Sequence, residues 1–100
     1  MKVPINSPAD LGEVIRATRK SNNLRMDDLA GIAGVGHVFV GDVEYGKETA
    51  QIGRVMRLLG ELGIKLSAEV PASAEAYLGK IRDQNGLVRP SQRKTQKGTQ

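Results

Sequence analysis

The sequence predicts a mainly α-helical domain of four to five helices followed by one β-strand. Apolar residues recur at intervals of three and four over much of residues 8–62, which is the spacing of amphipathic helices. Residues 64–70 instead alternate apolar and polar side chains, which is typical of a half-buried strand. The chain has 100 residues, of which 39% are hydrophobic, so we expect one small core and no enzyme with a deep cleft.

The first helix is expected to begin at Ser7-Pro8. A serine hydroxyl caps free backbone amides, and proline suits the first helical position. Polar residues 21–23 should end this helix. Its apolar face is predicted to consist of Leu11, Val14, Ile15 and Thr18.

The second and third helices are expected over about Met26–Ala33 and from Gly36 or His37 to Glu44-Tyr45, with Gly46 as the stop. Two aspartates open the second helix, where negative charge favours the positive end of the helix dipole. Ala30 is small where the helices would cross, and Gly34 suits a left-handed turn between them. This layout is that of a helix-turn-helix, whose second helix reads the DNA major groove.

A fourth helix is expected after Thr49, which would cap it. Its predicted apolar stripe is Ile52, Val55, Met56, Leu59 and Leu62. The strand that follows should stop at Pro71. The residues expected to carry this strand in a dimer are Ile64, Leu66, Ala68 and Val70.

This strand has no obvious partner in a helical chain, and unpaired strand edges seek another chain. We therefore predict a homodimer in which residues 64–70 pair with their symmetry mate, so that two reading helices face a palindromic operator in double-stranded DNA. Pairing with residues 2–5 of the same chain is the alternative, and both pairings are compatible with one sheet.

Three parts of the chain are distinguished. Residues 1–71 are predicted to form the helix-turn-helix and dimerisation domain, residues 72–86 a short helix capped by Ser73, and residues 87–100 a disordered basic tail. Residues 1–71 hold nine basic and nine acidic residues, so the net charge of +4 comes from the remainder. The tail is either an arm that releases counterions from phosphates or a solvated terminus.

Composition argues against several classes of function. The chain has no cysteine and one histidine, which leaves neither a disulfide framework nor a thiolate or histidine-rich metal site. It shows no phosphate-binding glycine loop and no nucleophile motif, so we expect no enzyme, no cofactor and no metal. Short apolar runs and an N-terminal segment without a signal-peptide core predict a cytoplasmic protein with no membrane partner.

Residues 11–66 resemble the lambda-repressor-like, or XRE-type, helix-turn-helix domain. The resemblance rests on LxxxDLAxxAGV over residues 24–35 and VExGK over residues 43–47. Residues 5–8 and 59–66, with the strand after them, look most like HipB-type antitoxins. This resemblance implies a homodimer that represses its own operon and binds a HipA-type serine/threonine kinase toxin, restraining the kinase and using it as corepressor.

Base reading is then expected at the exposed start of the third helix, from His37, Val38 and Asp42. Histidine can donate to a guanine or phosphate acceptor, valine can pack on a thymine methyl, and aspartate can accept from a cytosine amino group. For His37 and Asp42, an incidental surface role is an equal alternative.

Other residues are expected to support the interface. Phosphate contacts are predicted for Arg25, Gly36 and Lys47. Arg19 and Glu44 occupy positions where related repressors hold a salt bridge, so we expect a partly buried ion pair that orients the reading helix.

Two departures from the family pattern leave other functions open. Arg25-Met26 stands where such domains have Thr or Ser followed by Gln, and Gly36 replaces a usual Ser or Thr cap. Gly41 within the reading helix costs about 1 kcal/mol relative to alanine. The alternatives are a free-standing XRE-type regulator without a toxin and a protein-binding adaptor that no longer reads DNA.

Overall fold

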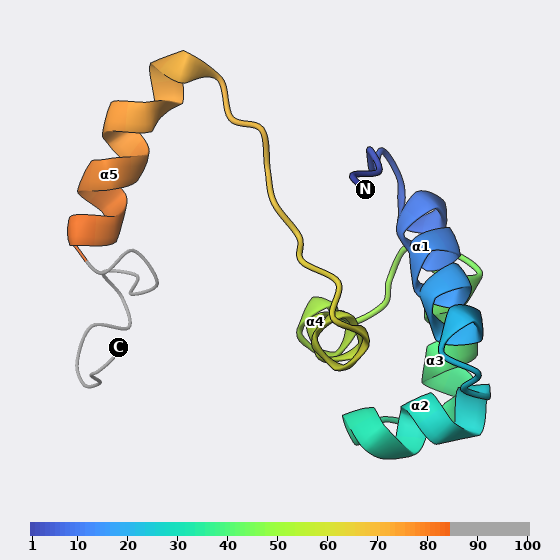
Figure 1. The fold of residues 1–100 in the computed structure, drawn as a ribbon. Helices are drawn as coiled ribbons and strands as arrows, with labels where there is room; N and C mark the ends of the chain where they lie inside the picture. Colours follow the sequence, from blue (N-terminus) through green and yellow to red (C-terminus); the bar gives the residue numbers. More distant parts are fainter. Residues whose placement is uncertain (85–100) are drawn as a thin grey trace, which may run out of the picture. The chain divides into compact units, whose positions relative to one another are not determined.

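Four helices make up the first of two units, Met1–Leu66, in a computed structural model that describes residues 1–84. They are α1 (Pro8–Ser21), α2 (Met26–Ala33), α3 (His37–Glu44) and α4 (Ile52–Leu62). In Figure 1, α1 lies alongside α3, and α2 crosses one end of this pair. In the second unit, Ser67–Gln100, the described residues contain a 3-10 turn (Ala72–Ala74) and α5 (Glu75–Asp83). The predicted mainly α-helical class is confirmed.

Local sequence signals set the helix ends. The Ser7 hydroxyl caps α1 by accepting a hydrogen bond of 3.1 Å from the Asp10 N–H. Gly34 ends α2 in the left-handed conformation at φ 69°, which glycine adopts without steric cost. The next N–H, that of Val35, then donates to the Ala30 carbonyl at 3.0 Å. The tight turn between α2 and α3 therefore forms as the sequence predicts.

The core lies where α1, α2, α3 and α4 meet. Ile15, Leu29, Val40 and Leu58 are fully buried, each from a different helix. Gly12 lets the backbone of α1 approach the end of α3 closely, since a Cβ on Gly12 would lie 2.5 Å from the Val43 carbonyl oxygen. The inner side of α3 is thus held against a packed scaffold.

Two predicted caps are wrong. Thr49 lies in a turn, and α4 begins at Ile52 with Gln51 in the capping position. Ser73 lies inside the 3-10 turn, and α5 follows Ala74 without a side-chain cap. In both places the chain makes an extra tight turn before the helix, which moves the first free N–H groups past the predicted hydroxyl.

The predicted stripe of α4 is wrong at two positions. Ile52 is 69% exposed and Met56 is 49% exposed, whereas Leu58, which the prediction omitted, is fully buried. The buried set follows the i, i+3, i+4, i+7 pattern of one helix face. It consists of Val55, Leu58, Leu59 and Leu62.

Residues 64–70 form no strand in this single chain, and none of residues 1–84 is in a β-strand. The alternative pairing with residues 2–5 is therefore absent. Gly63 turns the chain at φ 72° and places Ile64 against the core, while Leu66, Ala68 and Val70 are exposed. A strand needs a second backbone for its N–H and C=O groups, so the pairing between two copies stays a prediction. The predicted tail, residues 87–100, and the end of the short helix lie outside the described residues.

Candidate nucleic-acid interface

The outer face of α3 carries an open depression that gathers the predicted reading residues. Val38 is 72% exposed at its edge, and Lys47 lies just beyond the end of the helix. The lining is His37, Val38, Gly41, Asp42, Tyr45, Gly46 and Lys47.

Charged side chains are already paired around this depression. The Lys47 ammonium nitrogen lies 3.4 Å from an Asp42 carboxylate oxygen, and both side chains stay partly exposed. His37 Nδ1 lies 2.5 Å from Asp27 Oδ1, which joins the start of α3 to the first turn of α2. Asp27 was not among the predicted site residues. No sequence signal marks this pair, because its members lie ten residues apart and meet only through the turn.

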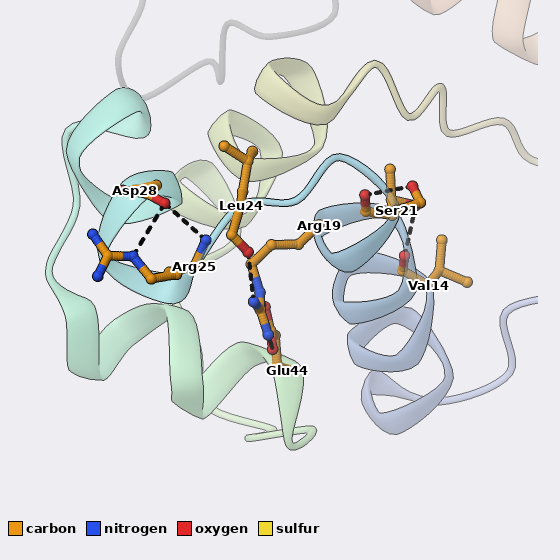
Figure 2. A network of polar contacts seen from close by, with 8 residues as sticks. Val14, Arg19, Ser21, Leu24, Arg25, Asp28 and Glu44 are labelled. Atoms are coloured by element: carbon orange, nitrogen blue, oxygen red, sulfur yellow. Dashed lines mark hydrogen bonds and ion pairs between the residues drawn. The ribbon is translucent and has the colours of Figure 1, made fainter.

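α2 begins without the capping hydroxyl that the family pattern has, and a carboxylate takes its place. The Asp28 carboxylate accepts a 2.9 Å hydrogen bond from the Arg25 backbone N–H, shown in Figure 2, and this bond lowers the pKa of Asp28. The Arg25 side chain is 81% exposed, with its Nε 3.5 Å from Asp28. An aspartate at the third helical position was the available sequence signal for this cap.

The start of α3 has no side-chain cap. Gly36 occupies the capping position in an extended conformation, and nothing lies within 4 Å of where its Cβ would be. Gly41, by contrast, turns toward α2, where its Cβ would meet Met26 Sδ at 3.8 Å. The approach of a ligand to the α3 backbone is therefore open at Gly36, the predicted phosphate contact.

Arg19 and Glu44 form a buried ion pair behind the reading face. Arg19 Nε and Nη2 donate to the two Glu44 carboxylate oxygens at 2.6 and 3.0 Å, and Nη1 donates to the Leu24 carbonyl at 2.8 Å (Figure 2). The side chains are 8% and 0% exposed. The hydrogen bonds that Arg19 donates to Glu44 raise the pKa of Arg19 against the opposing effect of burial. The pair ties α1 and the loop before α2 to the end of α3.

Tyr45 is a second residue that the sequence prediction missed. It is 73% exposed, and the Arg16 guanidinium carbon lies 5.3 Å from its ring centroid, which is within the range of a cation–π contact. In the sequence Tyr45 is an ordinary residue at a helix end, so only its exposure in the structure indicates that it belongs to this face. Together with Lys47 it extends the face beyond α3.

The geometry defines a helix-turn-helix whose second helix presents donors, acceptors and a methyl surface to solvent. Within residues 1–84, no helix is long and apolar enough to cross a membrane, and no group of three or more His, Asp or Glu could hold a metal ion. A major groove admits a helix that carries such a face.

Comparison with known proteins identifies the family. No family model matches the chain. It is 51% identical over 67 residues to a protein of Sinorhizobium fredii strain NGR234 named uncharacterized HTH-type transcriptional regulator y4mF, and the match covers 67% of this chain and 88% of that protein. The chain therefore belongs to the HTH-type transcriptional regulators.

Solved structures show the same fold. A structure named HipB-O4 20mer complex matches with a TM-score of 0.64 at 17% identity, covering 69% of this chain and 97% of that chain. A structure named HipA-HipB-O2-O3 complex gives the same values. The chain thus has the helix-turn-helix fold of HipB.

Proposed function

We propose that this protein is a cytoplasmic, non-catalytic repressor that binds a palindromic operator as a homodimer, autoregulates its operon and acts as the antitoxin of a HipA-type kinase. The DNA-binding part of the proposal rests on the exposed outer face of α3, whose inner side packs on the core, in a chain that belongs to an HTH-type family. His37, Val38 and Asp42 would read base edges there. Arg25, Gly36 and Lys47 would hold the phosphates.

The support for phosphate contact lies in exposure and charge. Arg25 is 81% exposed and the Lys47 side chain 53% exposed, so either cation can leave its present carboxylate partner for a phosphate at little cost. Each phosphate contact releases a counterion, so it steepens the dependence of affinity on salt. Lys47→Ala should reduce the slope of log K against log salt by about one.

Lys47→Ala is tested by titrating labelled duplex DNA from upstream of the chain's own coding sequence at several salt concentrations. Arg57→Ala is the matched control, because Arg57 is an exposed cation on α4, which lines no part of the depression. Equal slopes for the Lys47 variant and the unaltered protein would contradict the phosphate contact.

The dimer is supported by the chain after α4. Leu66 and Val70 are each 48% exposed, which leaves apolar side chains available for pairing in an extended segment. Ala68→Pro removes a backbone N–H from the middle of the proposed pairing and should convert a dimer to a monomer in sedimentation. Ala68→Val keeps the N–H and should remain dimeric. A monomeric unaltered protein at micromolar concentration would refute the pairing.

The antitoxin part is supported by the fold shared with a HipB chain that is in complex with HipA and DNA. The test is co-expression with the genomic neighbour of this gene, followed by purification through this chain and measurement of operator binding with and without the partner. Co-purification of a HipA-type kinase and tighter DNA binding in its presence are expected.

Two other outcomes favour the alternatives. DNA binding without a co-purifying kinase indicates a free-standing regulator, which the name of the bacterial relative favours. Co-purification without DNA binding indicates an adaptor. Against the adaptor, both helices of the motif are formed despite the departures at Met26, Gly36 and Gly41.

A further inference from the structure

Asp27 contacts His37 at the outer face of α3, and Asp27 is not among the residues proposed above to bind DNA. Their side chains are 68% and 57% exposed, and the 2.5 Å separation of Oδ1 and Nδ1 places them in direct contact. Asp27 belongs to the first turn of α2 and His37 is the first residue of α3. The contact therefore fixes the imidazole at the end of α3 that enters the groove in this motif.

The chemistry of the pair decides which hydrogen bond His37 can offer. An ionised carboxylate has only acceptors, so the imidazole proton must lie on Nδ1, next to Asp27. Nε2 is then the one ring nitrogen left for a ligand. In the neutral ring Nε2 accepts a hydrogen bond, and only in the imidazolium does it donate one.

The other charged groups around this face are occupied with partners. On α3 and the turn after it, Asp42 lies against Lys47. On α2, Asp28 holds Arg25. On α1, Arg19 is bound to Glu44 and Arg16 lies over the Tyr45 ring.

Asp27 is thus the carboxylate that bears on His37. A bound DNA phosphate backbone would add a second source of negative potential at the same imidazole.

We propose that Asp27 is a positioning residue for DNA binding: it holds His37 with Nε2 free, and His37 contacts DNA as an imidazolium that donates to an acceptor atom of a phosphate or a guanine. This inference rests on the proposed DNA-binding function. Only the imidazolium form donates from Nε2, and a histidine side chain ordinarily loses its charge between pH 5 and 8. DNA affinity then decreases as pH rises across that range.

The first test concerns the free protein and needs no DNA. His37 is the only histidine in the chain, so the imidazole nitrogen resonances in a ¹⁵N spectrum belong to it without assignment. At a pH where the ring is neutral, the unaltered protein should show the Nδ1-protonated tautomer, and Asp27→Ala should lose that preference. Equal tautomer populations in the two proteins would overturn the positioning role.

The second test measures affinity for a duplex of the chain's upstream DNA from pH 6 to 8 at constant ionic strength. Because the contact needs one proton, the association constant should fall by up to about tenfold for each unit by which the pH rises. His37→Gln should remove this dependence, and Asp27→Ala should weaken binding at pH 6. Glu13→Gln, which removes an exposed carboxylate from α1, should behave as the unaltered protein.

The outcomes separate this inference from the proposed function. Tight binding that does not change with pH overturns the imidazolium contact and leaves DNA binding intact, whereas no binding at any pH overturns both. Selection from a random duplex pool identifies the acceptor. A base preference lost in His37→Gln indicates guanine, and an unchanged preference with a lower salt slope indicates phosphate.

Discussion

Arg19→Ala should destabilise the domain strongly, because it leaves the Glu44 carboxylate charged, fully buried and without its partner. The substitution removes two hydrogen bonds to that carboxylate, at 2.6 and 3.0 Å, and one to the Leu24 carbonyl at 2.8 Å. Removing one member of a buried ion pair costs about 3–5 kcal/mol. Domains of this kind have a free energy of unfolding of only about 5–15 kcal/mol, so a large share would be lost.

The assay is urea unfolding at pH 7, followed by far-ultraviolet circular dichroism. With an m-value of about 1 kcal/mol/M, a loss of about 3 kcal/mol lowers the midpoint by about 3 M. The double variant Arg19→Met, Glu44→Leu should recover most of the stability, since a hydrophobic replacement of a buried pair is often neutral. Base preference, measured where Arg19→Ala is still folded, should not change. A loss below about 1 kcal/mol, as for a surface pair, would refute this reasoning.

Further predictions concern two glycines and one cap. Gly12→Ala should lower the free energy of unfolding, measured by thermal unfolding, by about 1–3 kcal/mol, because the new Cβ would lie 2.5 Å from the Val43 carbonyl oxygen. Gly41→Ala makes only an ordinary contact at 3.8 Å, so it should leave the free energy of unfolding unchanged or raise it by up to about 1 kcal/mol. Equal melting temperatures for the two variants would contradict the packing. Asp28→Asn should lower the melting temperature at pH 7, where the carboxylate accepts from the Arg25 N–H. Since folding lowers the pKa of Asp28, its contribution is complete above the usual value of 3.8 and is lost as pH falls through the folded-state value. A difference between the proteins that persisted unchanged at pH 2 would argue against this cap.

Much of the fold could be predicted because its signals are local. The Ser7 cap, the left-handed Gly34 and the apolar periodicity each depend on a few neighbouring residues. The two wrong cap predictions, at Thr49 and Ser73, also have a local cause. Each residue type is a good helix cap, but the chain makes one more turn before the helix begins. Apolar periodicity also did not identify the buried face of α4, since it included the exposed Ile52 and Met56 and omitted the buried Leu58.

The candidate site was predictable as a face and not as a set of contacts. The motif predicts base-reading residues on α3, and His37, Val38 and Asp42 do line one depression. Asp27 and Tyr45 were missed because neither carries a sequence signal for its role.

The sequence by itself determined the helix-turn-helix, since helix periodicity, caps and a left-handed glycine act over distances of a few residues. The family resemblance indicates the Arg19–Glu44 pair, but only the tertiary structure shows how deeply that pair is buried and that His37 meets Asp27. Glu44 lies 25 positions from Arg19, and His37 lies ten from Asp27, and each pair forms because helix packing brings the two side chains together. Charge alone made every Asp, Glu, Arg and Lys a candidate partner. Burial makes the Arg19–Glu44 pair a structural contact, whereas the Asp27–His37 pair is exposed and accessible to a ligand.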